Sequence, residues 1–246
     1  MKVKSVDLQT NFCNSKRLEI SNITKYYNNE PVIKNISLNL RENETASLLG
    51  VSGVGKTTLF NIIAGLHKPD EGKILLNDDD ITGIPGKIGY MPQKDLLIPY
   101  KTVLENVSLP LIIKGTPKKE AYLTASDNFK RFGLFGCEKK YPYQLSGGMR
   151  QRAALLRTYM FNSQIMLLDE PFSALDVKTR DEMYQWFTEE FSNKNISTMI
   201  ITHNISEAIK LSDRIYVMAN QPGEIAKEFE DCKNKDEIKP QISSLF

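Results

Sequence analysis

The sequence predicts an α/β protein whose core is a mainly parallel sheet. Three short, continuous apolar runs indicate this fold: TASLLG at 45–50, QIMLLD at 164–169 and STMIIT at 197–202. Each run ends abruptly at a polar residue or a glycine, which is typical of strands buried on both faces between helices. Because ligands bind at the carboxyl edge of open α/β sheets, we expect the groups that follow the runs to share one site.

The composition is that of an ordinary globular protein. Of 246 residues, 41% are hydrophobic and 25% are charged, and the formal net charge is +2 at pH 7. Such a balanced charge argues neither for nor against nucleic acid. Cys13, Cys137 and Cys232 form no CxxC pair and are expected to be reduced thiols. The N-terminus has no secretory h-region, and no apolar run approaches the ~18 to 20 residues of a membrane span.

Two further segments predict structure beside the sheet. Residues 16–40 form short, partly alternating strands, LEISNI and VIKNISLNL, joined by a turn at NNEP. GKILLNDDDITGI predicts another strand pair, and its acidic tip at Asp78–Asp80 is expected to be a solvated hairpin rather than a pair of catalytic carboxylates. The stretch from Gln93 to Ser163 is helical in texture, with Thr116 expected to cap a helix whose first residue is Pro117.

The clearest motif is GVSGVGKTT, which matches G-x-x-x-x-G-K-[ST] between a predicted strand and a predicted helix. The backbone N–H groups of such a loop wrap a phosphate at a helix N-terminus. Lys56 would reach the β and γ oxygens, and the Thr57 hydroxyl would ligate Mg²⁺. The segment therefore predicts nucleotide binding by Gly50, Val51, Ser52, Gly53, Val54, Gly55, Lys56, Thr57 and Thr58.

Polar residues after the other runs supply candidate catalytic groups. Asp169 can hold Mg²⁺ directly or through water. Glu170 can align a water for attack on the γ-phosphorus and take its proton, although it could simply begin a loop or cap a helix. His203 is expected to contact the γ-phosphate rather than end a strand as an inert residue. Gln93, in GYMPQKD, can ligate Mg²⁺ through its amide oxygen and orient water through its NH₂ group.

A second glycine-rich segment, QLSGGMRQR, lies at the apparent start of a helix but has no lysine. Together with GVSGVGKTT, MPQKD, IMLLDEP, SALD and ITH, it resembles the ATP-binding subunit of an ABC transporter over roughly residues 18–223. The LSGG element is the most specific, because ordinary phosphate-loop ATPases lack it. DLLIPYKTVLENVSLPL, DEPFSALDVKTR and QPGEI are similar to importers of the nitrate, sulfonate and taurine type, which include carriers of thiamine-precursor pyrimidines.

This resemblance implies the fold of a P-loop NTPase, an ABC ATPase cassette with a mixed sheet core, an antiparallel β subdomain and a helical subdomain. The expected divisions are an N-terminal extension at 1–16, the ATP-binding domain at 17–225 with its helical subdomain at about 94–163, and a C-terminal tail at 226–246. The implied cofactors are ATP and Mg²⁺.

The resemblance also assigns roles to single residues. It implies that adenine stacks on Tyr27, with Tyr26 as the alternative. The implied catalytic residues are Glu170, His203 and Gln93, and the implied metal ligands are Thr57, Gln93 and Asp169. The signature residues would contact ATP held by a second copy of the chain, and Asp176 would belong to the D-loop; the signature residues are Ser146, Gly147 and Gly148. Asn43 stands where glycine is usual and Asn204 where aspartate is usual, and neither change removes a ligand.

The implied partners are a second ATPase subunit forming a homodimer, transmembrane permease subunits and an extracytoplasmic solute-binding protein, with no nucleic acid. The expected location is peripheral, on the cytoplasmic face of the cell membrane. Two alternatives are an ABC export subunit and a soluble ABC ATPase acting on nucleic acid or ribosomes. The importer-like middle region argues against the first. The absence of sustained heptads and the nearly neutral charge argue against the second.

Overall fold

The computed structural model describes residues 16–193, 196–230 and 235–244. Cys13, Cys232 and all of the expected N-terminal extension except its last residue lie outside these ranges. The strands are β1 (Lys16–Tyr27), β2 (Glu30–Arg41), β3 (Thr45–Gly50), β4 (Glu71–Leu76), β5 (Asp79–Asp80), β6 (Gly89–Met91), β7 (Ile165–Asp169), β8 (Ser197–Thr202), β9 (Arg214–Ala219) and β10 (Glu224–Glu230). The helices are α1 (Lys56–Ile63), α2 (Val103–Ile113), α3 (Lys118–Phe129), η1 (Pro142–Gln144), α4 (Gly147–Met160), α5 (Val177–Asn193), α6 (Ile205–Leu211) and α7 (Lys235–Ser243).

The central sheet confirms the α/β prediction. Its strand order is β10-β9-β3-β8-β7-β6, and the three predicted apolar runs are β3, β7 and β8. Each pairing among β9, β3, β8, β7 and β6 is parallel, whereas β10 joins β9 antiparallel. Ile201 of β8 pairs with both Leu48 of β3 and Asp169 of β7. The carboxyl ends of these three strands therefore lie at one edge.

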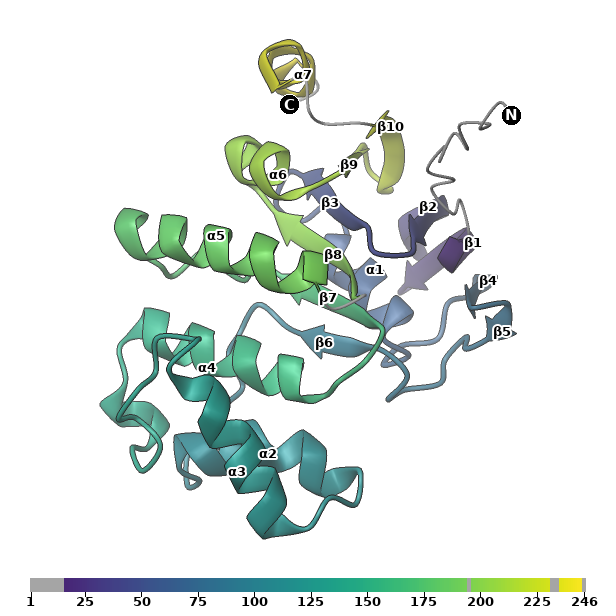
Figure 1. Cartoon of the computed structure of the whole chain (residues 1–246). Coiled ribbons are helices and arrows are strands. Elements are labelled where there is room, and N and C mark those ends of the chain that lie inside the picture. Colours follow the sequence, from purple (N-terminus) through teal and green to yellow (C-terminus); the bar gives the residue numbers. More distant parts are fainter. Residues whose placement is uncertain (1–15, 194–195, 231–234, 245–246) are drawn as a thin grey trace, which may run out of the picture.

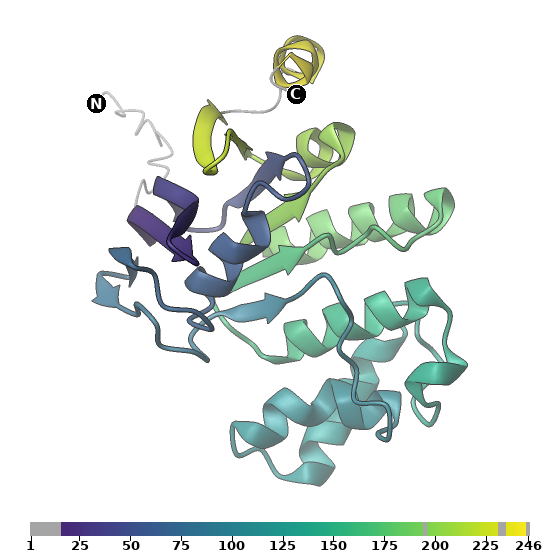
Figure 2. The same cartoon turned by 180° about the vertical axis from the view of Figure 1, so that it is seen from behind.

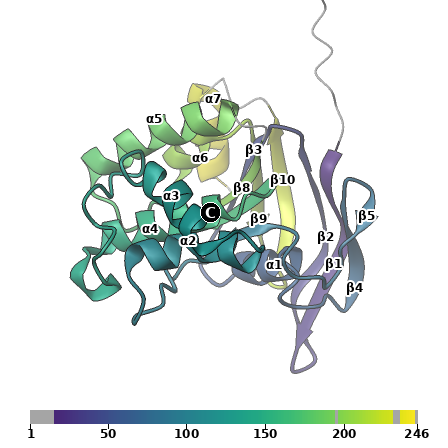
Figure 3. The ribbon, with the colours of Figure 1, turned by 60° about the horizontal axis from the view of Figure 1, so that its bottom comes forward.

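The sheet is buried on both faces, which explains why its strands are continuously apolar. Along β7, Ile165 and Leu167 belong to a core shared with α1 and the antiparallel strands. Met166 and Leu168 point the other way, into the core shared with α4 and α5. Side chains alternate between the two faces of a strand. A polar residue on either face of β7 would therefore be buried in one of the two apolar cores. Figures 1 and 3 show α1 on one side of the sheet and α5 on the other.

The N-terminal segment forms the predicted antiparallel subdomain. Its sheet has the order β2-β1-β4-β5, with β1 paired antiparallel to β2 and β4. The acidic tip is an exposed hairpin: Asn77 and Asp78 have positive φ values of 48° and 70° at the turn. The Asp80 carboxylate accepts the backbone N–H of Thr82 at 2.8 Å. The three carboxylates thus serve a solvated turn, as the sequence predicted.

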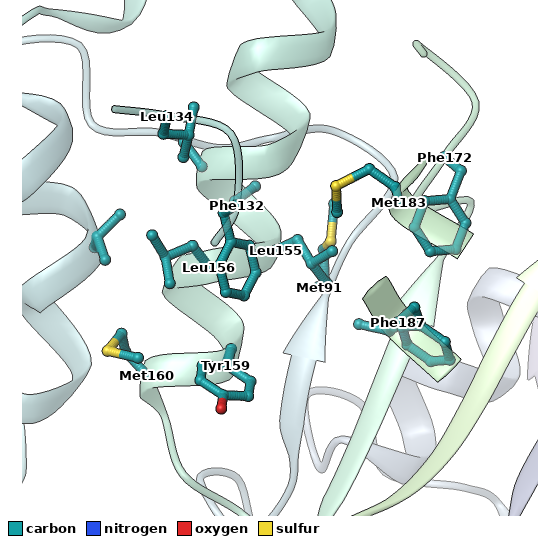
Figure 4. Close-up of a cluster of buried hydrophobic side chains, with 14 of the residues drawn as sticks. Met91, Phe132, Leu134, Leu155, Leu156, Tyr159, Met160, Phe172, Met183 and Phe187 are labelled. Atoms are coloured by element: carbon teal, nitrogen blue, oxygen red, sulfur yellow. The ribbon is translucent and has the colours of Figure 1, made fainter. Parts of the chain in front are cut away.

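The helical layer around α2, α3 and α4 packs below the sheet in Figure 2. Its core is apolar and joins α4 to β6 and α5, with Phe132, Leu155 and Met91 among the buried side chains in Figure 4. The expected Thr116 cap is wrong, because α3 begins at Lys118 with Pro117 at the cap position and no side-chain cap bond. Among the described residues, no helix combines the length and apolarity needed to cross a membrane.

The C-terminal segment adds to the central domain. The expected boundary between 225 and 226 falls within β10, which extends the sheet beside β9. Beyond it, α7 lies next to α6 (Figure 1). Ile238 and Ile242 of α7 share a buried cluster with Ala208 of α6 and Leu49 of β3. The segment therefore covers the outer face of the helix that follows β8.

A buried ion pair ties the start of β3 to β9. The guanidinium of Arg214, only 2% exposed, donates to both carboxylate oxygens of Glu44 at 2.7 Å. A third bond of 2.8 Å reaches Glu228 on β10. Because Arg214 is almost fully removed from water, these carboxylates compensate the lost hydration of its charge.

Glu44→Ala should therefore lower the free energy of unfolding by about 3 kcal/mol or more, since it leaves a buried guanidinium without its main partner. Asp181→Ala, which removes one half of the exposed Lys210–Asp181 pair at 2.7 Å, is the control and should change stability by less than about 1 kcal/mol. Urea unfolding of both variants measures the difference. Equal midpoints for the two variants would contradict the importance of the Arg214 pair.

Candidate functional site

The phosphate-binding loop connects the end of β3 to the start of α1. Gly55 precedes the helix with φ 104°, and a Cβ there would lie 2.5 Å from Cγ2 of Ile33. Only glycine fits this backbone without strain or a clash. The Lys56 ammonium donates to the carbonyls of Gly50 at 2.7 Å and Val51 at 2.8 Å. The ammonium group of Lys56 is therefore held against the backbone of its own loop.

Two opposite charges are held beside this loop. Burial lowers the pKa of Lys56, while Glu170 and Asp169 act to raise it. Burial raises the pKa of Asp169, and a hydrogen bond from Thr57 and the charge of Lys56 oppose that rise. The Thr57 hydroxyl donates to Oδ2 of Asp169 at 2.8 Å. The structure thus brings the hydroxyl and carboxylate predicted as Mg²⁺ ligands into direct contact.

Glu170 occupies a constrained position just after β7. Its φ is 51°, in the left-handed region that non-glycine residues seldom adopt. Its N–H donates to the carbonyl of Ile201 in β8 at 2.9 Å. Gln93 Nε2 donates to one carboxylate oxygen at 3.2 Å, and His203 Nδ1 lies 3.1 Å from the other. The three predicted catalytic side chains therefore meet at one carboxylate.

These groups surround one hollow of about 360 Å³. The hollow lies at the carboxyl edge of the sheet, as predicted from the order of the apolar runs. Gly50, Val51 and Val54 shape the loop but do not line the hollow. Val32 and Ile201 line it without having been predicted. The predicted residues in its wall are Ser52, Gly53, Gly55, Lys56, Thr57, Thr58, Gln93, Asp169, Glu170 and His203.

A second hollow of about 540 Å³ shares Val32 and Gly53 with the first. Its wall includes Tyr27 but not the alternative aromatic Tyr26. The Tyr27 hydroxyl lies 2.9 Å from Nδ1 of His67, and the two rings meet edge to face. An aromatic surface therefore lies next to the phosphate-binding loop, and no sequence motif pointed to His67 as its partner.

The LSGG residues lie outside both hollows. Ser146 caps α4 by accepting the N–H of Met149 at 3.2 Å, and Gly147 and Gly148 form the first turn. A Cβ on Gly147 would meet nothing within 4 Å. Asp176 caps α5 by accepting the N–H of Thr179 at 3.1 Å. The structure thus brings neither the signature residues nor Asp176 to the hollow around Lys56.

Sequence reasoning missed Gln151, which lies in the quoted QLSGGMRQR segment. This side chain is only 5% exposed and contacts the segment that follows Glu170. Its helical spacing was an available signal: Ala154, Leu155 and Thr158 follow at i+3, i+4 and i+7 and are all buried. A glutamine on the buried face of a helix needs hydrogen-bonding partners, and this is a reason to look for them.

The sequence departures fit the local backbone. Asn43 has φ 57°, which explains why glycine would suit its position and why asparagine can replace it. Asn204 caps α6 by accepting the N–H of Glu207 at 3.1 Å, a role that aspartate would also fill. Both departures therefore preserve the local backbone, Asn43 before β3 and Asn204 after β8.

A phosphate-binding loop and an Asp–Glu pair at the edge of a mainly parallel sheet, together with an LSGG segment that begins a helix, define an ATP-binding cassette. The family model described as ABC transporter matches residues 33–173. The formylaminopyrimidine import ATP-binding protein ThiZ of Halalkalibacterium halodurans is 48% identical over 197 residues, 80% of this chain and 77% of that protein. The taurine import ATP-binding protein TauB of Escherichia coli O157:H7 is 38% identical over 208 residues, 85% and 82% of the two chains.

Solved structures agree with this assignment. The dimeric ATP-binding cassette MJ0796, in a post-hydrolysis state bound to ADP and Pi, superposes with a TM-score of 0.80 at 34% identity. The match covers 87% of this chain and 98% of that one. The chain belongs to the ABC transporter family, and it is an ATP-binding, ATP-hydrolysing cassette of that family.

Lys56→Ala should weaken ATP binding by at least about tenfold, because it removes a charge-assisted bond to phosphate. Equilibrium titration with a fluorescent ATP analogue measures the affinity. Lys87→Ala removes an exposed lysine away from the loop and is the matched control, expected to bind as the unaltered chain does. Unchanged affinity in Lys56→Ala would remove the lysine from the phosphate site.

Proposed function

We propose that this chain powers uptake of a small solute, of the nitrate, sulfonate, taurine or pyrimidine-precursor type, as the ATPase subunit of an importer. The site supports an ATPase that works as a pair: Lys56 and Glu170 line one hollow, while the exposed Ser146 at the start of α4 takes no part in it. The import direction is supported by the curated relatives ThiZ and TauB, both of which are import ATP-binding proteins.

Glu170 is proposed as the general base for hydrolysis. An ionised carboxylate accepts a proton from water as the water oxygen bonds to the γ-phosphorus. The bond from that phosphorus to the bridging oxygen breaks, and ADP and inorganic phosphate are the products. Gln93 and His203 each contact one oxygen of this carboxylate, which limits its rotation and aims it into the hollow. Lys56 neutralises charge on the phosphates as the bond breaks.

The donor set next to the loop fits Mg²⁺. Thr57 Oγ1 and the Asp169 carboxylate are hard oxygen ligands 2.8 Å apart, and the Gln93 amide lines the same hollow. These three residues are proposed to hold the ion, which supplies charge neutralisation at the phosphates when bound. The partial burial of Asp169 strengthens this interaction, because a buried carboxylate gains most from a cation.

Tyr27 is proposed to carry the adenine. Its ring lines the hollow that adjoins the phosphate loop through Val32 and Gly53, and it is 41% exposed. A flat aromatic surface at that place can stack on a base while the phosphates reach Lys56. Tyr26 is absent from the wall, which favours Tyr27 over its neighbour.

A second copy of the chain is proposed to complete each site. The relative MJ0796 forms a dimer, and a two-fold arrangement makes every interface contact twice. The N-terminus of α4 offers free backbone N–H groups and a serine hydroxyl, which suit a phosphate held by the other copy. The permease subunits and an extracytoplasmic binding protein are proposed as further partners, with this chain peripheral to the cytoplasmic face of the membrane.

Glu170→Gln tests the proposed function directly. ATP should still bind, but turnover should fall by at least about 100-fold because the amide cannot accept the proton. The purified variant should then dimerise in ATP and return to monomer in ADP, as measured by analytical ultracentrifugation. Glu182→Gln, on an exposed face of α5, is the control and should hydrolyse ATP at the unaltered rate. Normal turnover in Glu170→Gln would refute the base assignment.

Ser146→Arg tests the shared site. The arginine should leave ATP affinity unchanged, because Ser146 lies outside the wall around Lys56, yet it should block dimerisation and abolish hydrolysis. Thr124→Arg introduces the same side chain on the exposed face of α3 and should retain both properties. A Ser146→Arg protein that hydrolyses ATP fully would show that each chain works alone.

A further inference from the structure

Both backbone polar groups of Glu170 are fixed by neighbouring elements. Its N–H donates to Ile201 of β8, and its carbonyl accepts from Nε2 of Gln151 at 2.7 Å. A left-handed backbone at a residue with a side chain costs free energy and persists only where the surroundings hold it. Rotation of this peptide would redirect the carboxylate, so the two bonds bear directly on where the proposed base points.

Gln151 uses both ends of its amide on this segment. Nε2 reaches the Glu170 carbonyl and also lies 3.2 Å from the Ser173 hydroxyl. Oε1 accepts the N–H of Ala174 at 2.9 Å. The side chain thus brackets the turn from Glu170 to Ala174, which leads directly into the D-loop. Because the amide is buried, water does not readily replace either bond.

Gln151 belongs to the same helix as the signature. It lies five residues after Ser146, whose hydroxyl caps α4, and Gly148 packs against the other end of the bracketed turn. A Cβ on Gly148 would lie 3.0 Å from Leu175 Cδ2 and 3.3 Å from the carbonyl of Ala174. The first turns of α4 and the Glu170–Leu175 segment therefore form one packed unit, with little room for either to shift alone.

We infer that Gln151 is a positioning residue that links the signature helix to the catalytic glutamate of the same chain. It does not touch the nucleotide hollow and acts through the backbone of Glu170 and Ala174. The inference rests on the proposed function, in which Ser146 binds ATP held by the partner. Under that function, docking of α4 on one nucleotide sets the aim of the base at the other, so the two sites are coupled through one side chain.

The chemistry requires glutamine in particular. The Glu170 carbonyl accepts the Ser173 hydroxyl at 3.0 Å and the shorter bond from Gln151 at 2.7 Å. Among the described residues, only Gln151 joins that carbonyl to the Ala174 N–H through one planar group that carries both a donor and an acceptor. Methionine has a similar length but supplies neither. An ionised glutamate supplies the acceptor alone, whereas a protonated glutamate supplies both. Burial raises the pKa of a carboxyl, so a glutamate at position 151 would gain its donor as the pH falls through that raised pKa.

Steady-state hydrolysis by Gln151→Met tests the link. We expect kcat to fall at least tenfold while KM and the equilibrium affinity for ATP stay within twofold, because the base is misaimed but the phosphate loop is untouched. Gln164→Met is the matched control. That glutamine is exposed, bonds Asn77 at 3.0 Å and lies away from the hollow, so its kcat should be unchanged.

Two further measurements separate positioning from simple structural support. In a Glu170→Gln background, adding Gln151→Met should cause no further loss of single-turnover rate, because both changes act on the same base. In Gln151→Glu, kcat relative to the unaltered chain should rise at least threefold as the pH is lowered from 8 to 6. This variant retains the size and one bond of glutamine, and it provides the readout if Gln151→Met does not fold.

A kcat for Gln151→Met within twofold of the unaltered chain would overturn the inference. A Gln151→Met protein with lowered thermal stability but normal kcat per folded molecule would also overturn the inference. That result would mean that the Gln151 amide only stabilises the fold. Failure of the proposed function looks different: the unaltered chain would then lack ATPase activity, or Glu170→Gln would not dimerise in ATP. If the unaltered chain hydrolyses ATP and Glu170→Gln dimerises in ATP, a fully active Gln151→Met would refute the proposed link and leave the proposed function standing.

Discussion

The parallel pairing of β8 between β3 and β7 is the constraint on which the site depends. Ile201 is paired with Leu48 on one side and Asp169 on the other, and its carbonyl accepts the N–H of Glu170. This register aligns the ends of β3, β7 and β8, so the phosphate loop, the acidic pair and His203 lie at the same edge of the sheet. Because a slip of one residue would exchange the two buried faces of β8, the apolar cores on both sides fix the register. The geometry of the candidate site is thus held by packing of the two cores on either side of the sheet.

The parts predicted well from the sequence are those with local causes. A strand buried on both faces must be continuously apolar, so β3, β7 and β8 were visible as runs. Gly55 and Lys56 could be placed where a strand leads into a helix because a loop that wraps phosphate needs particular residues at fixed spacing. The meeting of Asp169, Glu170 and His203 followed from the shared edge of parallel strands. Each of these predictions required only neighbouring residues or one rule of sheet topology.

The parts that were missed depend on contacts between distant segments. Gln151 reaches Glu170 across 19 positions, and the Tyr27 hydroxyl meets His67 across 40. The left-handed backbone of Glu170 has no local signal either, because glutamate seldom adopts it. The pairing of β10 with β9 was likewise hidden by its charged sequence, in which Ile225 and Phe229 pack into different cores on either side of a register irregularity. Residue type alone does not say which partner satisfies a buried polar group.

The electrostatics of the hollow explain why the two glycine-rich segments of one chain should differ in their attraction for an anion. These segments are the loop that contains Lys56 and the N-terminus of α4. Burial acts against the charged forms of both Lys56 and Asp169, whose present partners are loop carbonyls and one hydroxyl. A nucleotide phosphate with its cation would give each of them an opposite charge, so the free energy of binding is concentrated at this loop.

The N-terminus of α4 has only backbone N–H groups and Ser146, and its attraction for a free anion is correspondingly weak. Under the proposed function, such a surface would respond to a phosphate that the loop of a second copy already holds. Through Gln151, that response would reach the backbone of Glu170, so the weaker loop would determine when the stronger one can hydrolyse what it binds.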